Sequence, residues 1–205
     1  MAELVVVDYG MGNLRSVSKA FESQGARVKV SSSPKDVRDA SKIVLPGVGA
    51  FTAAVKELEK RGLAEAIVNK IRSGTPYLGL CLGLQLLFDS SEETIGKGHA
   101  KGFGIIPGKV KKFKVKLKVP HMGWNTLSVK KKNCPLFDGV RADDAFYFVH
   151  SYYGEPKDKS WTLATTDYGK PFCSAVWKDN VFATQFHPEK SQAAGLGIIR
   201  NFIEL

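Results

Sequence analysis

Short apolar runs alternate with longer amphipathic stretches along the first half of the chain. Four mostly apolar runs have the length of buried strands, at residues 4–7, 28–30, 43–45 and 77–80. Between them, residues 14–24 and 51–71 place apolar side chains at helical spacing. Strands that alternate with helices in this way are typical of β-α-β units around a parallel sheet. We therefore predict a parallel sheet with helices on both faces.

Two further helical stretches and one break follow from the same pattern. The stretch 51–71 should form two helices, because Arg61 and Gly62 resemble a helix end. A short helix is predicted at 84–88, directly after the apolar run that ends at residue 80, and a final helix at 192–205. The apolar run and the short helix together predict a strand-to-helix turn around Cys81.

The second half of the chain has a different texture, with short β-rich runs between glycines and prolines. Strands are predicted at 112–119, 146–150, 161–166, 174–177 and 181–186. This half should be antiparallel or mixed. With no internal repeat, low-complexity tract or long linker, residues 1–205 are expected to form one domain. The fold class is thus α/β: a three-layer arrangement with a mostly parallel central sheet and an added antiparallel or mixed β portion.

Composition narrows the class of protein. Apolar residues make up 43% and charged residues 24% of the chain, and no apolar run approaches the roughly 18 residues of a membrane span. The N-terminal run 4–7 is too short for a signal peptide, so a soluble cytoplasmic protein is expected. Three cysteines, an odd number without metal-type pair spacing, argue against a disulfide framework or a metal site: Cys81, Cys134 and Cys173.

The formal net charge of +10 raises the question of nucleic-acid binding. Much of the charge lies in one lysine-rich region, at Lys109, Lys111, Lys112, Lys114, Lys116, Lys118, Lys130, Lys131 and Lys132. From residue 112 to 118, lysines alternate with apolar residues, which is the period of a half-buried strand. A solvated sheet face is favoured over a nucleic-acid groove. Attraction of a phosphorylated substrate or an acidic partner stays open.

The segment 79–83, with sequence Gly-Leu-Cys-Leu-Gly, contains the candidate nucleophile. A nucleophile elbow needs small residues two before and two after the reactive side chain, because the tight turn brings backbone segments together. Gly79 and Gly83 meet this requirement around Cys81. A cysteine at a helix N-terminus is also favoured as thiolate. The alternative is that Cys81 is only a small buried residue in an apolar run.

A candidate general base and its partner lie in the segment 185–191, Gln-Phe-His-Pro-Glu-Lys-Ser. Pro188 disfavours helix at His187, so the side chains of His187 and Glu189 should project to the same side. Glu189 would then orient the imidazole and leave its other nitrogen free to take the Cys81 proton. A chance tripeptide is the alternative. The remaining histidines have no carboxylate so placed: His99, His121 and His150.

A glycine-rich turn after the third predicted strand is the candidate oxyanion loop. The sequence from residue 46 to 51 is Pro-Gly-Val-Gly-Ala-Phe. The N–H group of Val48 or Gly49, together with that of Leu82, could stabilise the negative oxygen of a tetrahedral intermediate. An ordinary β-α turn and a phosphate cradle are the alternatives. The missing Lys-Ser/Thr pair argues against a nucleotide P-loop.

The segments 79–85 and 185–191 resemble the class I, or triad, glutamine amidotransferases in type, order and separation. Four further segments, 8–13, 46–49, 120–125 and 147–152, resemble the branch of that family that serves histidine biosynthesis. The resemblance implies that Cys81 hydrolyses glutamine through a glutamyl thioester, without cofactor or metal. It also implies a heterodimer in which the ammonia passes to a (β/α)8-barrel synthase subunit, HisF, which makes imidazole glycerol phosphate and AICAR from PRFAR.

The same resemblance assigns residues beyond the triad. It implies that glutamine is held by Gly47, Gln85, Ser151 and Tyr152. It places the partner interface near Asn13, Trp124 and Lys190. Two other functions stay open at this point: a glutaminase subunit with another acceptor, such as pyridoxal phosphate synthesis, and a basic nucleic-acid-binding module that has lost catalysis.

Overall fold

A sheet of eight strands runs through the middle of the molecule, in the order β2-β1-β3-β4-β14-β13-β12-β9. The computed structural model describes residues 4–93 and 100–205. Five neighbouring strands are parallel: β1 (Leu4–Val7), β2 (Val28–Ser31), β3 (Lys42–Gly47), β4 (Tyr77–Cys81) and β14 (Val181–Thr184). The other three are antiparallel: β13 (Pro171–Lys178), β12 (Thr162–Asp167) and β9 (Ser128–Val129).

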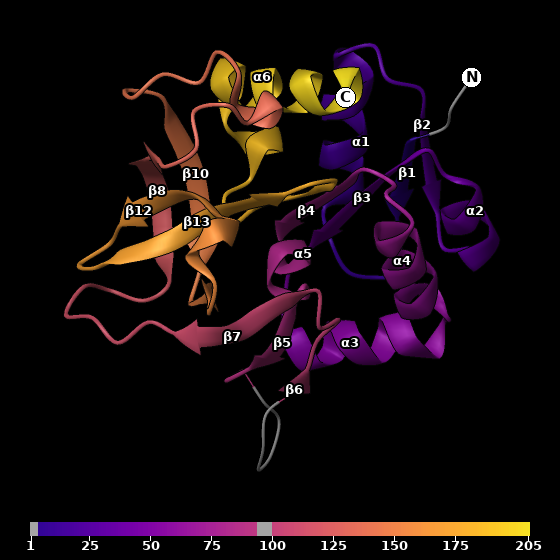
Figure 1. Cartoon of the computed structure of the whole chain (residues 1–205), viewed down its shortest axis with the longest axis horizontal. Coiled ribbons are helices and arrows are strands. Elements are labelled where there is room, and N and C mark those ends of the chain that lie inside the picture. The colour runs from indigo at the N-terminus through magenta and orange to yellow at the C-terminus, as the bar shows by residue number, and fades with distance from the viewer. Residues whose placement is uncertain (1–3, 94–99) are drawn as a thin grey trace.

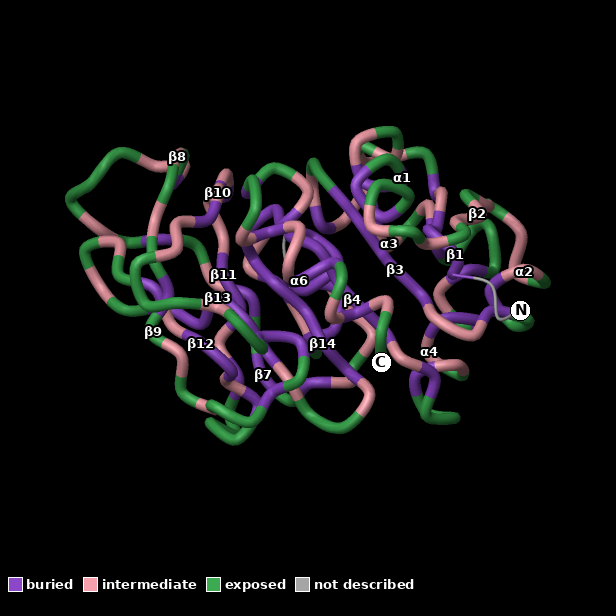
Figure 2. Tube along the Cα trace, turned by 90° about the horizontal axis from the view of Figure 1, so that it is seen from above, coloured by how far each residue is buried: buried purple, intermediate pink, exposed green. Residues whose placement is uncertain are grey.

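Helices cover both faces of the parallel part (Figure 1). On one face lie α1 (Leu14–Ser23) and α6 (Gln192–Glu204), joined by an edge-to-face contact between Phe21 and Phe202. On the other lie α2 (Pro34–Asp39), α3 (Phe51–Lys60) and α4 (Leu63–Arg72). Strands β1, β3, β4 and β14 are buried along nearly their whole length, whereas the edge strand β2 is partly exposed (Figure 2). The predicted three-layer α/β class is confirmed.

The alternation of side chains along β1 explains why the sheet has two cores. Val5 and Val7 belong to the cluster on the α3 and α4 side, whereas Leu4 and Val6 belong to the cluster on the α1 and α6 side. A strand buried on both faces requires apolar residues at every position, which is why its sequence is a continuous apolar run.

Two smaller sheets pack beside the central sheet (Figure 1). In one, β10 (Ala145–His150) pairs antiparallel with β8 (His121–Thr126). The other contains β11 (Tyr152–Pro156), β7 (Ile106–Lys112), β5 (Phe88–Ser91) and β6 (Ala100–Lys101). Short 3-10 helices lie at η1 (Pro135–Phe137), η2 (Lys159–Trp161) and η3 (Pro188–Lys190). Among the described helices, none is long and apolar enough to cross a membrane.

Most predicted elements of the first half are confirmed. The break in the stretch 51–71 falls at Gly62, whose φ of +67° suits a glycine between α3 and α4. In the second half, β12 begins one residue later than predicted, and β14 ends at Thr184 rather than at residue 186.

The predicted strand at 112–119 is wrong, because β7 ends where that prediction begins. Lys112 pairs with Tyr152, the first residue of β11, and the chain before Tyr152 turns away into β10. Among the described residues, no strand pairs with the chain after Phe113. Phe113 itself is buried against Tyr153 and Phe172, at ring-centroid distances of 4.8 and 5.2 Å. The alternation of lysines with apolar residues at 112–118 therefore reflects one buried aromatic side chain, Phe113, and not a strand.

The helix predicted at 84–88 is also wrong in extent. The helix after Cys81, α5, spans Leu82–Gln85 only, and Phe88 already begins β5. Because Leu86, Leu87 and Phe88 are all fully buried, the run is apolar on every side and periodicity cannot distinguish helix from strand there. A helix of four residues has a small dipole, so the predicted stabilisation of a Cys81 thiolate by α5 is weak.

Candidate active site

Three neighbouring parallel strands bring the predicted site residues to one edge of the sheet. In the ladder between β3 and β4, Gly47 pairs with Cys81. Strand β14 pairs parallel with β4 on its other side and leads to His187. Carboxyl ends of adjacent parallel strands meet at one edge, which is where open α/β sheets bind their ligands. The topology thus places the oxyanion loop, Cys81 and His187 together.

The turn at Cys81 has the backbone of a nucleophile elbow. Cys81 adopts φ 54° and ψ −100°, a conformation that L-residues rarely take, and such strain clusters at functional sites. A Cβ on Gly79 would lie 2.6 Å from the Gly83 carbonyl, and one on Gly83 would lie 1.9 Å from the Leu45 carbonyl oxygen. Both glycines are therefore required by close backbone approach, as the sequence predicts.

His187 and Glu189 meet behind Cys81. His187 Nδ1 lies 2.8 Å from Glu189 Oε1, and the two side chains are only 4% and 2% exposed. The backbone N–H of His187 donates to Tyr147 O at 2.9 Å, and Ser191 Oγ donates to His187 O at 2.6 Å. His187 Nε2 is buried and makes no hydrogen bond within the described residues. The base is thus fixed in orientation with one nitrogen available.

Charge at this site favours a protonated imidazole. Burial alone lowers the pKa of His187, but hydrogen bonding and charge from the neighbouring Cys81 and Glu189 side chains outweigh it and raise that pKa to about 10. A protonated imidazole held between Cys81 and Glu189 is the arrangement expected for a cysteine–histidine catalytic pair. The structure thus brings together the three residues that the sequence singled out for catalysis.

A cavity of about 430 Å³ opens next to Cys81. It contains the predicted oxyanion residues and three of the four predicted glutamine-binding residues. It is lined by Val48, Gly49, Cys81, Leu82, Gln85, Glu93, Pro120, Val149, His150, Ser151 and Tyr152. Gly47 is the exception, because it lies beneath the loop, where a Cβ would come within 2.3 Å of the Tyr9 hydroxyl. Close packing therefore requires a glycine at this position.

Two residues of this site were not found from the sequence. Gln185 is fully buried, and its Nε2 lies 3.5 Å from Cys81 Sγ. Gln85 Nε2 donates to Gln185 Oε1 at 3.1 Å and to Tyr152 O at 3.0 Å, which occupies both amide hydrogens of Gln85. Side chains two residues apart on an extended chain project to the same side, so the spacing of residues 185 and 187 could have placed Gln185 next to His187. Glu93 adds a carboxylate to the cavity wall, and no local pattern marks it.

Tyr9 is a further neighbour of the site that the sequence did not indicate. Its hydroxyl is buried beside Gly47 and has no hydrogen-bond partner within the described residues. Burial, assisted by the charge of Cys81, raises the pKa of Tyr9 above its ordinary value. The phenol is therefore neutral and unpaired.

The predicted partner residues lie on segments that neighbour His187. Trp124 is 49% exposed and contacts Tyr147 edge to face at 5.9 Å, and Lys190 Nζ lies 5.8 Å from the centre of the same ring. Asn13 is exposed at the start of α1, which packs against η3. Met122, on the same strand as Trp124, is 62% exposed.

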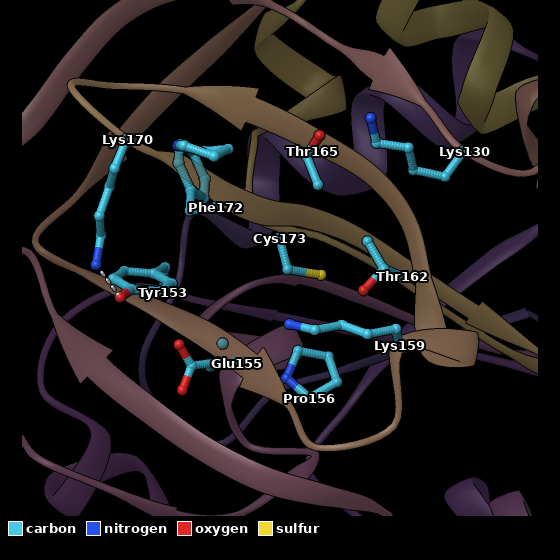
Figure 3. Close-up of a pocket in the computed structure, with 12 residues that line it drawn as sticks. Lys130, Tyr153, Glu155, Pro156, Lys159, Thr162, Thr165, Lys170, Phe172 and Cys173 are labelled. Atoms are coloured by element: carbon cyan, nitrogen blue, oxygen red, sulfur yellow. Dashed lines mark hydrogen bonds between the residues drawn. The ribbon is translucent and has the colours of Figure 1, made fainter.

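A second cavity, of about 440 Å³, lies between β11, β12 and β13 (Figure 3). It contains Cys173 together with lysines, among them Lys159 and Lys170, but no histidine. Burial raises the pKa of the Cys173 thiol to about 12, so it is not a thiolate at neutral pH. This cavity therefore contains no cysteine–histidine pair. No cluster of His, Cys, Asp and Glu that could hold a metal occurs in residues 4–93 and 100–205.

Comparison with known proteins agrees with this geometry. The family model for glutamine amidotransferase class-I matches residues 5–205, so the chain belongs to that family. The particular relatives carry a narrower name, Imidazole glycerol phosphate synthase subunit HisH. The protein of that name from Syntrophotalea carbinolica is 52% identical over 97% of this chain and 98% of its own. That from Geobacter sulfurreducens is 51% identical over the whole of both chains.

Solved structures show the same fold at lower identity. A crystal structure of a glutamine amidotransferase matches with a TM-score of 0.72 and 20% identity, covering 98% of this chain and 97% of that one. The structure of PurLQS from Thermotoga maritima matches with a TM-score of 0.75 and 17% identity, covering 99% and 98%. The predicted family and fold class are confirmed.

Proposed function

We propose that the chain is the glutaminase subunit of an imidazole glycerol phosphate synthase, and that it hydrolyses glutamine to glutamate and ammonia. The observation that carries the proposal is the buried pair of His187 Nδ1 and Glu189 Oε1 at 2.8 Å, next to a cysteine in a strained elbow. Relatives named HisH, about half identical over nearly the full chain, favour the histidine pathway over pyridoxal phosphate synthesis.

The first half of the reaction forms a thioester. His187 accepts the proton of Cys81, and the thiolate attacks the side-chain amide carbon of glutamine. A new C–S bond forms as the carbonyl π electrons move to oxygen, and the N–H groups of Leu82 and of Val48 or Gly49 stabilise that oxyanion. When the intermediate collapses, the C–N bond breaks and His187 gives its proton to the departing ammonia.

The second half returns the enzyme to its starting state. Water attacks the thioester carbon while His187 takes the proton of that water. The C–S bond then breaks, glutamate leaves, and Cys81 is restored. Glu189 holds Nδ1–H throughout, so that Nε2 is the nitrogen that exchanges protons.

The cavity wall supplies groups that match glutamine. Glu93 offers a carboxylate to the α-ammonium group of the substrate. The backbone of Ser151 and Tyr152 and the side-chain oxygen of Gln85 offer further hydrogen bonds. These groups line the same cavity as Cys81.

The ammonia produced here needs an acceptor subunit. The exposed residues of β8 offer a surface that such a subunit can cover. We propose that the synthase subunit HisF, in a heterodimer, covers Met122 and Trp124 and contacts Asn13 and Lys190. The net charge of +10 would aid association with an acidic partner. A single domain over residues 1–205 and a cytoplasmic location are part of the same proposal, and neither nucleic acid nor membrane enters it.

Substitution of the nucleophile tests the proposal. The variant Cys81→Ala, assayed for glutamate release with the synthase subunit present, should lose turnover while keeping the wild-type circular dichroism spectrum. Cys134→Ala is the matched control, because Cys134 is also a buried free cysteine but lies away from the cavity. Retained glutamine hydrolysis in Cys81→Ala would show that the assignment is wrong.

A further inference from the structure

Two buried histidines lie between the exposed strand β8 and the glutamine cavity. His121 begins β8, His150 ends β10, and the two residues are paired across the β8–β10 ladder. His121 Nδ1 lies 3.0 Å from His150 Nε2, and His150 Nδ1 lies 2.8 Å from Tyr152 O. At the other end, Asn125 Nδ2 lies 3.4 Å from His121 Nε2. The proposed reaction uses neither imidazole.

These hydrogen bonds form a series from Asn125 through His121 and His150 to the Tyr152 carbonyl. The groups at its two ends fix the direction of each bond. Burial lowers the pKa of His121 to about 4 and that of His150 to about 3, so both rings are neutral at neutral pH. The Tyr152 carbonyl can only accept, so His150 Nδ1 donates to it and His150 Nε2 accepts from His121 Nδ1. His121 Nε2 then accepts from the amide of Asn125. Only one pair of tautomers satisfies all three contacts.

Packing holds the two rings in this orientation. His121 is stacked between Phe148, at a centroid distance of 4.8 Å, and Tyr168, at 4.0 Å. The Asn125 amide also donates to Asp167 O at 2.8 Å, and its oxygen accepts from Thr126 N–H at 2.9 Å. The amide therefore cannot rotate without breaking backbone contacts.

The Tyr152 carbonyl is shared with the active site. It also accepts from Gln85 Nε2, at 3.0 Å, and Gln85 is linked through Gln185 to Cys81 Sγ. Tyr152 and its neighbour Ser151 form part of the cavity wall. A continuous series of hydrogen bonds thus runs from Asn125, one residue beyond the exposed Trp124, to the nucleophile.

We propose that His121 and His150 are positioning residues that hold the Tyr152 carbonyl, and with it Gln85 and the cavity wall, in the arrangement that binds glutamine. Asn125 ties this arrangement to the strand that carries Met122 and Trp124, so a partner seated on β8 acts on glutamine affinity. The proposal rests on the proposed function and deepens it by naming the residues that set substrate affinity.

Two substitutions of His150 separate the loss of its Nδ1 donor from the loss of the ring. The variant His150→Asn keeps a donor near the position of Nδ1, whereas His150→Leu has similar bulk and no donor. With the synthase subunit present, His150→Leu should raise KM for glutamine about tenfold, the loss expected for one buried hydrogen bond, with kcat within about twofold of wild type. His150→Asn should restore KM to within about threefold of wild type.

Tyr168→Phe serves as the matched control. It keeps the ring that stacks on His121 and removes only a hydroxyl that donates to Lys118 O, outside the series. Its KM should equal that of wild type. If His150→Leu does not fold, as judged by circular dichroism, then His121→Leu provides the same test one bond further away, with KM raised about threefold.

The outcomes distinguish this inference from the proposed function. A wild-type KM in His150→Leu, or a loss of kcat with unchanged KM, overturns the positioning role. Equal impairment of His150→Asn and His150→Leu also overturns it, because the pair would then matter only for packing. In each case wild-type protein still hydrolyses glutamine. Absence of glutamine hydrolysis in wild type, with Cys81 still alkylated by iodoacetamide, instead refutes the proposed function.

Discussion

The parallel half and the antiparallel half of this molecule contribute to the site in different ways. Strands β3 and β4 are buried on both faces and present Cys81 through a turn that leaves no room for a Cβ at Gly79 or Gly83. Strands β8, β10 and β11 instead supply the cavity wall and the exposed residues of the proposed partner surface. The chemistry is thus built on rigid backbone, and substrate affinity on a part of the fold that a partner can reach.

The largest effect should come from the orienting carboxylate in the parallel half. In Glu189→Gln, the amide can donate to Nδ1, which places the ring proton on Nε2 and prevents it from accepting the Cys81 proton. We expect kcat to fall about 10²- to 10⁴-fold. Glutamate release with the synthase subunit present measures this. Glu204→Gln, at an exposed carboxylate at the end of α6, should have wild-type kcat.

Gly83→Ala tests how closely the elbow is packed. The same substitution at Gly197, a glycine with open space around it, is the comparison. A methyl group at Gly83 would meet the Leu45 carbonyl at 1.9 Å, whereas one at Gly197, in α6, meets nothing within 4 Å. Gly83→Ala should lower the free energy of unfolding by about 3 kcal/mol or more. Gly197→Ala should raise it by up to about 1 kcal/mol, because alanine favours helix. Urea titration measures both, and equal effects would contradict the close packing.

The dependence of stability on pH reports the charge at His187. Because its pKa is raised from 6.5 to about 10, the imidazolium stabilises the fold fully below pH 6.5, and that contribution is lost as pH rises to about 10. The free energy of unfolding of wild type, minus that of Cys81→Ala, should therefore decrease between these values. Urea titrations at several pH values measure it. A difference that grows with pH would mean that His187 is neutral in the fold.

The smallest effect concerns Tyr9. Its buried hydroxyl has no partner within the described residues, so Tyr9→Phe removes a desolvated polar group without creating a cavity. We expect the free energy of unfolding to rise by about 1 kcal/mol. Loss of stability of that size would instead show that the hydroxyl has a partner. Urea titration at pH 7 is sufficient, with Tyr168→Phe as the control that loses a made hydrogen bond.

The two halves also differ in how far the sequence predicts them. The parallel strands and the elbow follow from local rules, because an all-apolar run and a Gly-x-Cys-x-Gly turn each have few structural solutions. The strand expected at 112–119 does not exist because its would-be partner turns away at Ser151, which no local pattern records. The helix after Cys81 is short because Phe88 pairs with Ile106. Tertiary pairing overrides local preference in both places.

The site shows the same division. His187 and Glu189 lie two residues apart, so their meeting could be predicted from Pro188 and strand periodicity. Gln185 and Glu93 join the site through pairing and cavity shape, and the His121–His150 contact spans residues far apart in the chain. Such contacts depend on the finished fold. The roles of the site residues therefore stay predictions until the chemistry is measured.

Capture of the covalent intermediate tests the central claim most directly. The chain, mixed with its synthase subunit and glutamine, is quenched in acid during turnover, digested and analysed by mass spectrometry. The account predicts a glutamyl adduct on the peptide that contains Cys81, absent in Cys81→Ala and present in Cys134→Ala. Turnover with no adduct on Cys81, or with an adduct on Cys173, would contradict it.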